Sequence, residues 1–346
     1  MPGPITTEPP AGATGTMLEV EDLRVQITSR NGLVRAVDGV SLDVGRGEAL
    51  GLVGESGSGK SMTLRAILGV LPPEAKITSG RILLDGTDLV PLRNSDLNHI
   101  RGPKMSMIFQ EPMSALNPVM RVGYQIAEGP RIHLGYSRAQ AHERALDLMR
   151  RVGIPDPERR FRAFPHEFSG GRRQRVMIAI ALSCDPEIIL CDEPTTALDV
   201  TIQDQILRLL ARLCRDSGVS LIFVTHDLPV VAQLCQQVAV MYAGELVERG
   251  AVHDVLLDPR HPYTLGLVRS APDVEHVRDS LVPIPGSPPS LVHPPSGCRF
   301  HPRCPFVEED CRVQPTPLRQ LPGGRSTACL HYERVVESVE AERIVP

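Results

Sequence analysis

An α/β fold is the class that the 346-residue sequence predicts, and three features point to it. From Leu18 to about Gly250, short β-branched runs alternate with longer helical patterns. The strand-like run Glu48–Val53 leads into a glycine-rich segment followed by a helical run, which is the setting that a phosphate-binding loop requires. A second strand-like run, Ile188–Cys191, is apolar throughout and ends in two carboxylates.

The other elements follow the same alternation. Further strands are expected at Leu18–Ile27, Arg81–Leu84, Met105–Gln110, Leu221–Val224 and Val238–Met241. Helices are expected at Ser61–Val70, Arg138–Val152, Gly170–Ser183, Val200–Asp216 and Leu228–Gln236. The stretch from about 111 to 168 reads as mostly helical. We therefore expect an inserted helical subdomain there, where a partner can dock.

The composition is that of an ordinary soluble globular protein and argues against several functions. A formal net charge of −4 leaves no basic excess for nucleic acid, and 3% aromatic residues without tryptophan supply few stacking surfaces. No run approaches the roughly 18 apolar residues of a membrane span, so any membrane role is expected to come through a partner. Residues 1–16 are rich in Pro, Gly and Thr, which predicts a disordered lead and not a signal peptide.

The composition changes after Gly250. The segments Pro283–Pro289 and Pro294-Pro295 mark a stiff, extended connection into a region rich in cysteine. We expect a domain boundary near residues 265–282, which separates a large domain at 17–265 from an extension at 266–346.

The segment Gly54–Ser61 has the spacing G-x-x-x-x-G-K-[ST], which is typical of loops that wrap a nucleotide's phosphates. Its glycines let backbone N–H groups turn toward anionic oxygens, and the following helix adds its N-terminal partial positive charge. Lys60 supplies a full charge and Ser61 a hydroxyl ligand for Mg²⁺. The alternative is a plain glycine-rich turn, which the flanking strand and helix disfavour. The expected nucleotide-contacting residues are Gly54, Glu55, Ser56, Gly57, Ser58, Gly59, Lys60, Ser61 and Met62.

Two further segments carry groups suited to phosphate chemistry. Asp192, at the mouth of a buried strand, is suited to hold Mg²⁺ through its water shell, and Glu193 to orient and deprotonate an attacking water. The turn Ser169-Gly170-Gly171 opens a strongly helical run, so its hydroxyl, amides and helix N-terminus can bind another set of phosphates. Read alone, this turn is also a common helix cap.

Together these residues resemble the ATP-binding subunits of ABC transporters, over essentially the whole of Leu18–Gly250. The resemblance implies the ABC-type fold of P-loop NTPases, with a RecA-like core, an antiparallel β subdomain and a helical subdomain. It makes Gly54–Ser61 the Walker A motif, Ser169-Gly170-Gly171 the signature, and Asp192-Glu193 the Walker B motif with its catalytic base. It adds Gln110 as the Q-loop glutamine, Thr196–Asp199 as the D-loop, and His226 as the switch histidine that contacts the γ-phosphate.

The resemblance also implies a mechanism. Two such subunits sandwich two ATP molecules, each bound by Walker A of one subunit and the signature of the other. The expected partners are a second ATPase subunit, two membrane permeases and, indirectly, an extracytoplasmic peptide-binding protein, with this chain peripheral on the cytoplasmic face of the membrane. The resemblance assigns catalysis to Lys60, Gln110, Glu193 and His226. It assigns Mg²⁺ binding to Ser61, Gln110 and Asp192. The remaining nucleotide contacts are expected from Ser169, Gly170, Gly171 and Asp199.

Two departures from the family pattern stand out. Phe168 takes the place of the usual leucine before the signature, and Arg172 stands where glutamine is often found. The stretch 26–35 lacks the aromatic residue that commonly stacks on adenine. Arg30 or Arg35 can stack through its guanidinium plane instead, although an exposed, solvated arginine is an equal alternative.

Longer stretches are similar to the peptide importers within this family. Phe109–Met120 and His261–Thr264 are typical of ATPases that serve oligopeptide, dipeptide, nickel and glutathione uptake. Pro285–Pro289, followed by Gly297–Pro305, resembles the C-terminal extension of the oligopeptide and dipeptide members, which favours peptides over nickel. The alternative from another class is a soluble ABC ATPase acting on ribosomes or DNA. Such proteins usually carry two ATPase domains or a long coiled coil, whereas this chain has one phosphate loop.

Four of the eight cysteines cluster near the C-terminus with the spacing C-x₅-C-x₆-C-x₁₇-C. The spacing does not fit the close pairs of zinc fingers, and four thiolates suit an iron–sulfur cluster. The resemblance to dipeptide-type ATPases favours a [4Fe–4S] cluster on Cys298, Cys304, Cys311 and Cys329. Zinc and unliganded buried thiols remain the alternatives, with His301 and His331 as further ligands or as plain surface histidines. The other four are expected to be buried structural thiols: Cys184, Cys191, Cys214 and Cys235.

Overall fold

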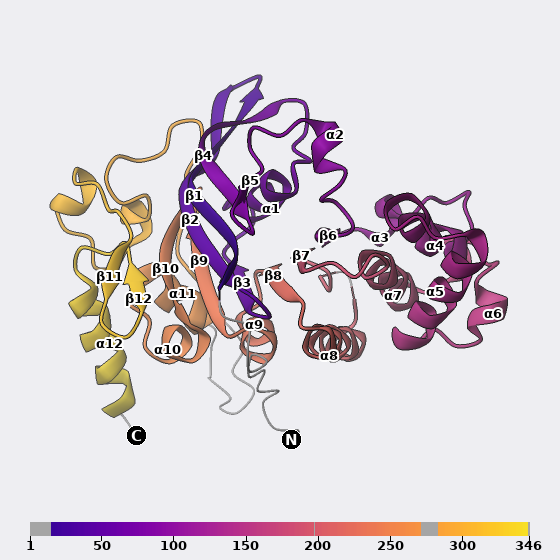
Figure 1. Ribbon diagram of the computed structural model, residues 1–346. Helices are drawn as coiled ribbons and strands as arrows, with labels where there is room; N and C mark the ends of the chain where they lie inside the picture. Colours follow the sequence, from indigo (N-terminus) through magenta and orange to yellow (C-terminus); the bar gives the residue numbers. More distant parts are fainter. Residues whose placement is uncertain (1–14, 197, 271–282, 345–346) are drawn as a thin grey trace. The chain divides into compact units, whose positions relative to one another are not determined.

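The computed structural model describes residues 15–196, 198–270 and 283–344 (Figure 1). Its chain divides into two compact units. The phosphate-loop unit comprises Leu18–Asp43, Ala49–Val90 and Val224–Pro346. The carboxylate unit comprises Met1–Met17, Val44–Glu48 and Pro91–Phe223. Most of the expected N-terminal lead, Ala197 of the D-loop, and residues 271–282 of the expected domain boundary lie outside the described residues.

The phosphate-loop unit contains two groups of strands. One is a four-stranded antiparallel sheet in the order β2 (Gly32–Gly45), β1 (Thr16–Ser29), β4 (Ala75–Leu84) and β5 (Thr87–Asp88). The other runs in the order β11 (Arg319–Leu321), β12 (Arg325–Thr327), β10 (Glu245–Ala251), β9 (Gln237–Tyr242) and β3 (Ala49–Val53). Within it β3 and β9 are parallel, while β9, β10, β12 and β11 pair antiparallel.

Strand β3 carries the phosphate loop at its end, and its sequence explains its place. All five of its residues are buried, as expected of a parallel strand covered on both faces. Gly51 lies in its centre, where a Cβ atom would come within 2.5 Å of Val231 Cγ1 on α9 (Leu228–Leu234). The glycine therefore allows α9 to pack directly on the strand. Helix α1 (Lys60–Leu68) leads away from the loop.

The C-terminal extension is part of the phosphate-loop unit. It adds β12 to the edge of β10 through the pairs Glu248↔Thr327 and Arg249↔Ser326, and β11 follows β12. Helix α11 (Pro262–Ser270) runs across residue 265, the expected end of the large domain, and α10 (Val252–Leu257) precedes it. Helix α12 (Tyr332–Ile344) packs Val335 and Val339 against Leu265 of α11. The division at 265–282 remains a prediction.

The carboxylate unit combines strands with a helical array. Strands β6 (Met105–Ile108) and β7 (Ile188–Asp192) are parallel, and β8 (Ser220–Thr225) is next to β7 in the strand order. The helices are α2 (Asn94–Leu97), α3 (Pro112–Ala115), α4 (Val122–His133), α5 (Arg138–Arg151), α6 (Pro157–Arg160), a 3₁₀ turn η1 (Pro165–Glu167), α7 (Gly170–Ala181) and α8 (Val200–Ser217). A capping box fixes the start of α5, since Ser137 and Gln140 bond each other's backbone N–H.

The α/β class and the predicted strands and helices are confirmed, with differences at their ends. Strand β6 ends at Ile108, two residues before the predicted end at Gln110, because the chain then turns away toward α3. Strand β4 begins at Ala75, six residues before the expected start. Helices α3, α4 and α6 lie within the stretch 111–168 that was expected to be mostly helical. The strands and α-helices that were not predicted are β2, β5, β10, β11, β12, α2, α10, α11 and α12.

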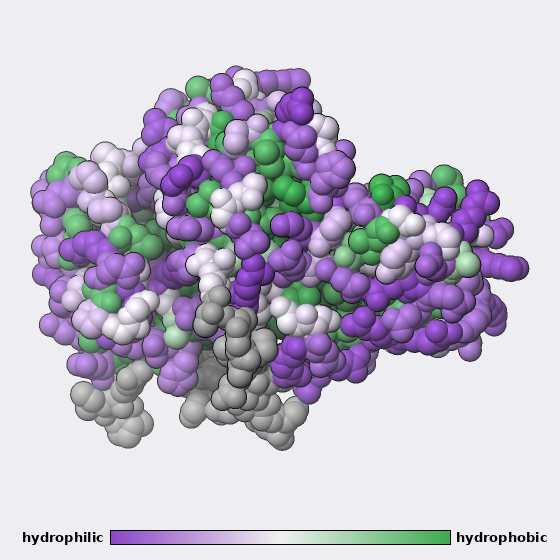
Figure 2. All heavy atoms as spheres, viewed as in Figure 1, coloured by the Kyte–Doolittle hydropathy of each residue, from purple (hydrophilic) through white to green (hydrophobic). Residues whose placement is uncertain are grey.

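Among the described residues, no helix combines the length and the apolar character that crossing a membrane demands. On the face shown in Figure 2, hydrophilic side chains cover most of the helical array, with single apolar side chains between them. The exposed large apolar residues of the carboxylate unit are Phe109, Met113, Val119, Tyr124, Ile132 and Val200.

Candidate functional site

The phosphate loop has a backbone that only glycine can supply at two positions. Gly54 ends β3, and a Cβ atom there would lie 2.1 Å from the backbone oxygen of Met241. Gly59 has φ +107°, and its Cβ atom would lie 2.2 Å from the oxygen of Ala36. The loop is therefore pressed against β9 and β2 on one side. Gly57, with φ +80°, has no atom near its Cβ position and faces open space.

Lys60 lies at the centre of this loop and is 4% exposed. Its Nζ atom donates to the carbonyl oxygens of Gly54 at 2.6 Å and Glu55 at 2.8 Å, and lies 3.4 Å from Ser58 Oγ. Lys60 is also the first residue of α1, so a full charge and a helix N-terminus meet at the same place. Ser61 follows in the first turn of α1. This arrangement fits a polyphosphate, and a serine hydroxyl at the position of Ser61 is a suitable ligand for an accompanying Mg²⁺.

The carboxylate unit brings Gln110 and Glu193 together. Gln110 follows β6, and its Nε2 atom donates to Glu193 Oε2 at 3.3 Å. Thr196 Oγ1 donates to the same carboxylate oxygen at 2.9 Å. Asp192 is the last residue of β7 and is 2% exposed, directly before Glu193. Glu193 has φ +44°, a strained conformation of the kind that clusters at functional sites.

The signature segment caps α7. Ser169 precedes the helix with extended backbone angles, and both Ser169 and Gly170 are exposed. A Cβ atom on Gly171 would lie 2.6 Å from Ile202 Cγ2, so this glycine lets α7 approach the start of α8. Asp199 is the residue before α8. The signature and the end of the D-loop therefore lie side by side, with the N-terminus of the 12-residue α7 open to an anion.

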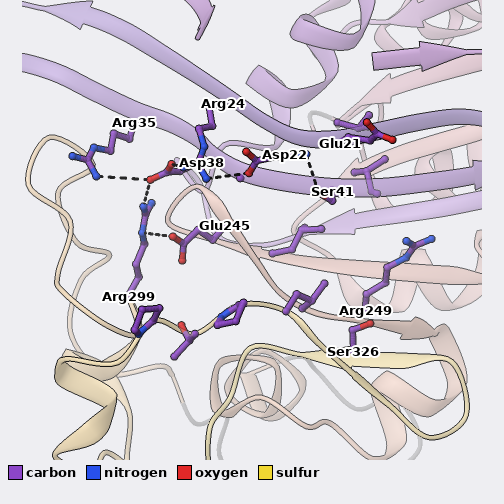
Figure 3. A pocket seen from close by; sticks show the side chains of 18 of the residues that line it. Glu21, Asp22, Arg24, Arg35, Asp38, Ser41, Glu245, Arg249, Arg299 and Ser326 are labelled. Carbon is purple, nitrogen blue, oxygen red and sulfur yellow. Dashed lines mark hydrogen bonds and ion pairs between the residues drawn. The ribbon is translucent and has the colours of Figure 1, made fainter. Parts of the chain in front are cut away.

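Residues at both departures from the family pattern have defined surroundings. Phe168 is a buried core residue, and the Arg160 guanidinium lies 5.6 Å from the centre of its ring. Arg35 lies with an Nη1 atom 4.0 Å from Asp38 Oδ2 (Figure 3), and its backbone N–H donates to Leu291 of the extension. Arg30 is exposed.

His226 is exposed and directly follows β8. The next residue's N–H, that of Asp227, donates to Thr225 Oγ1, which fixes the turn after the strand. Lys60 and His226 belong to the phosphate-loop unit, whereas Gln110, Asp192, Glu193 and Ser169 belong to the carboxylate unit.

Two residues at the phosphate loop were missed by the sequence analysis. Tyr263 is fully buried on α11, and its hydroxyl accepts a hydrogen bond of 2.7 Å from the backbone N–H of Glu55. Arg303, in the extension, forms an ion pair of 2.7 Å with the Glu55 carboxylate. The only sequence signals for them are an aromatic residue after His261-Pro262 and an arginine inside the cysteine-rich segment.

The four C-terminal cysteines line one small cavity, together with His261, Phe300, His301, Phe306 and His331. Burial raises the pKa of Cys298 to about 11 and the pKa values of Cys304 and Cys329 to about 12. Burial also raises the pKa of Cys311. Deprotonated thiols in this cavity therefore need a bound cation to stabilise their charge. Cys184, Cys191 and Cys235 are buried as expected, whereas Cys214 is only partly so.

The spacing of these sulfur atoms bears on the kind of metal. Among the described residues, the group with ligand atoms within 4.8 Å of one another is Asp310, Cys311 and His331. No three of the four cysteine sulfurs all lie within 4.8 Å of one another. A tetrahedral zinc site with Zn–S bonds of about 2.3 Å needs sulfurs only about 3.8 Å apart. The four sulfurs as a set are thus spaced more widely than the ligands of a four-cysteine zinc site.

The extension is anchored to the rest of the phosphate-loop unit by buried arginines. Arg299 bonds Asp38 on β2 and lies 3.0 Å from Glu245 on β10, and the same Asp38 also bonds Arg24 on β1 (Figure 3). Arg325 on β12 lies 3.1 Å from the buried Glu248. The pairs that Asp38 and Glu245 form with Arg24 and Arg299 border a groove lined by residues of β1, β2, β10 and the proline-rich segment Pro294-Pro295.

Comparisons with known proteins agree with this geometry. The family described as ABC transporter matches residues 37–196, which include the phosphate loop and both carboxylates. The family described as oligopeptide/dipeptide transporter, C-terminal region, matches residues 247–311. The chain belongs to the ABC transporter family, as an ATP-hydrolysing ATP-binding subunit.

Its similar relatives are more specific in name. The dipeptide transport ATP-binding protein of Bacillus subtilis is 50% identical over 86% of this chain and 90% of its own length. The oligopeptide transport ATP-binding protein of Salmonella typhimurium is 46% identical over 90% of this chain and 93% of its own. A probable peptide ABC transporter ATP-binding protein of Sinorhizobium fredii is 48% identical over 92% of this chain and 96% of its own.

Solved structures match the fold. The dimeric ATP-binding cassette MJ0796 bound to ADP and phosphate has a TM-score of 0.62 and 28% identity, covering 68% of this chain and 99% of that one. A cassette of Clostridium perfringens, cbiO1, has a TM-score of 0.59 and 28% identity, covering 70% of this chain and 91% of that one.

Replacing Gly59 with alanine is expected to weaken ATP binding much more than replacing Gly57. Both glycines have positive φ, so both substitutions strain the backbone, but only the Gly59→Ala methyl group collides with Ala36. The measurement is the Kd for ATP by titration of a fluorescent analogue. Equal losses in Gly59→Ala and Gly57→Ala would contradict the fit of the loop against β2.

Proposed function

We propose that this chain is the ATP-hydrolysing subunit of an importer for peptides, a translocase that acts at the membrane with partner subunits. The observation that carries ATP hydrolysis is the Gln110–Glu193 contact beside Asp192 at the end of β7. The peptide cargo rests on the names of the relatives, which are dipeptide and oligopeptide transport proteins. Those relatives favour peptides over nickel or glutathione.

Glu193 is the general base in this proposal. Its carboxylate is oriented by hydrogen bonds from Gln110 and Thr196, as a base must be to accept a proton from one particular water. Asp192, Ser61 and Gln110 would hold Mg²⁺, and the bound ion would supply positive charge to the transferred phosphoryl group. Lys60 binds the β- and γ-phosphates, and His226 contacts the γ-phosphate from the end of β8.

A second ATPase subunit completes each ATP site. Ser169 and Gly170 are exposed at an open helix N-terminus, which suits phosphates bound by another molecule's loop. Asp199 lies beside them before α8 and contributes to the same shared site. The similar cassette MJ0796 is a dimer in its ADP-bound structure.

Membrane permeases dock on the segment that follows Gln110. Met113 is 61% exposed and Val119 83% exposed, and Phe109 and Tyr124 also present apolar surface to solvent. Apolar side chains gathered in one stretch next to the Q-loop glutamine suit a partner surface. A conformational change driven by ATP at Gln110 reaches the permease through this segment, and the chain is held at the cytoplasmic face of the membrane by the same contact.

We further propose that the cysteine cavity holds a [4Fe–4S] cluster on Cys298, Cys304, Cys311 and Cys329. The sulfurs surround one cavity and stand farther apart than a zinc site needs. When bound, the cluster supplies the positive charge that keeps four buried thiolates stable, and it staples an extension with little core of its own.

The variant Glu193→Gln is expected to bind ATP normally and to hydrolyse it at least about a hundredfold more slowly, because the general base is gone. ATP affinity and single-turnover hydrolysis of the assembled complex measure the two effects. Glu187 directly precedes the first residue of β7, at the opposite end of the strand from Glu193. Glu187→Gln is the matched control and is expected to keep the ATPase activity. Near-normal turnover in Glu193→Gln would remove Glu193 from the role of base.

Purification of the full chain from its native membrane is expected to bring along two permeases and a second ATPase subunit. Mass spectrometry of the isolated complex identifies them.

Substituting Met113→Asp and Val119→Asp should release the permeases while leaving ATP binding intact, because the change lies on the exposed segment. Recovery of ribosomes in place of permeases would overturn the transport assignment.

The double variant Cys298→Ser, Cys304→Ser is expected to lose iron and visible absorbance when purified without oxygen. Cys184→Ser, a buried cysteine outside the cavity, is the control and keeps both. Elemental analysis and the absorption spectrum are the readouts. A wild-type chain that contains zinc and no iron would contradict the cluster.

A further inference from the structure

A salt bridge joins the C-terminal extension to the phosphate loop. Arg303 Nη1 lies 2.7 Å from Glu55 Oε2, and Nη2 lies 3.1 Å from Glu55 Oε1. The pair is bidentate, the geometry in which arginine binds a carboxylate most strongly. The Arg303 side chain is 4% exposed, so solvent screens this pair much less than an ion pair on the surface.

Two backbone carbonyl oxygens and two aromatic rings also hold the Arg303 guanidinium in place. Arg303 Nε donates to the oxygen of Pro285 at 2.8 Å, and Nη2 donates to the oxygen of Ile284 at 3.3 Å. Its Cζ atom lies 5.8 Å from the ring centre of Tyr242 and 5.9 Å from that of Phe300. Burial by itself lowers the pKa of Arg303, but the hydrogen bonds to Glu55 and Tyr242 outweigh it and raise the pKa.

Glu55 is in turn held through both its backbone and its side chain. Its backbone N–H donates to the buried hydroxyl of Tyr263 at 2.7 Å, and its carbonyl oxygen accepts from Lys60 Nζ at 2.8 Å. Tyr263 and Arg303 both lie C-terminal to the strands that carry the site. Two side chains from that part of the chain therefore hold one residue of the phosphate loop, by its amide and by its carboxylate.

The negative charge of Glu55 is unfavourable for phosphate binding, and Arg303 neutralises it. A carboxylate within the phosphate loop repels a polyanion, and repulsion is strong where the surroundings are largely buried. The Arg303 guanidinium neutralises this carboxylate and turns it toward the extension. The loop is at the same time ordered before the ligand arrives, so binding costs less conformational entropy.

We infer that Arg303 is a positioning residue of the ATP site: it neutralises and orients Glu55, so that the C-terminal extension forms part of the phosphate-binding machinery. It acts through Glu55 and does not touch the nucleotide. This role concerns ATP binding and is independent of the transported cargo and of any metal at the cysteines.

A double-mutant cycle on the full chain tests the inference. Arg303→Met is expected to raise the Kd for ATP at least about tenfold and to raise KM with little change in kcat, because it leaves the negative charge of Glu55 in the phosphate loop without its neutralising partner. Glu55→Gln removes that charge. The double variant is therefore expected to bind ATP within about twofold of Glu55→Gln alone.

Arg325→Met is the matched control. Arg325 is also a buried arginine of the extension, but its ion-pair partners are Glu248 and Asp258, neither of which belongs to the phosphate loop. It is expected to lower the melting temperature with the Kd for ATP unchanged. The loss in Arg303→Met should shrink as ionic strength rises, since the repulsion is electrostatic.

Two results would overturn the inference. One is an unchanged Kd for ATP in Arg303→Met. The other is a Kd raised by the same factor whether or not Glu55 carries its carboxylate, which would mean that Arg303 only stabilises the fold of the extension. The effect of Arg303→Met can still be compared between the chain with Glu55 and the chain with Glu55→Gln if Arg303→Met lowers the melting temperature.

Discussion

The shape of the phosphate loop is the constraint on which the phosphate-loop unit depends. Gly54 and Gly59 press the loop so closely against Met241 and Ala36 that neither position has room for a side chain. This contact fixes the direction of α1 and brings Lys60 back onto the carbonyl oxygens of Gly54 and Glu55. The strands β2 and β9 are thereby built into the ATP site, although they supply no catalytic group.

The C-terminal extension continues the same packing and is not a separate appendage in this structure. Tyr242 on β9, Tyr263 on α11 and Phe300 in the extension form a buried aromatic cluster, with ring centres 4.5 to 5.5 Å apart. Phe300 lies between Cys298 and Cys304 along the chain, and Arg303 follows in the same turn. One short segment therefore borders the cysteine cavity on one side and reaches Glu55 on the other.

The sequence predicts the parts of the fold whose signal is local. Strands β3 and β7 are continuous apolar runs that end in motif residues, and both were found where expected. Strand β2 was missed because polar and exposed residues interrupt its apolar pattern. The family resemblance named Gln110 and Glu193 separately and did not predict their contact, and the Arg303–Glu55 pair joins residues 248 positions apart, for which no local pattern exists. Only the folded chain reveals that pair.

The distance along the chain between Glu55 and Arg303 has a consequence for synthesis. The phosphate loop leaves the ribosome long before Arg303 is made, since 248 residues separate them. Until then, Glu55 keeps an unneutralised carboxylate beside the loop, which disfavours ATP. With Arg303 in the role inferred for it, a nascent or truncated chain that lacks the extension is expected to bind nucleotide more weakly than a chain whose extension has folded onto the phosphate loop.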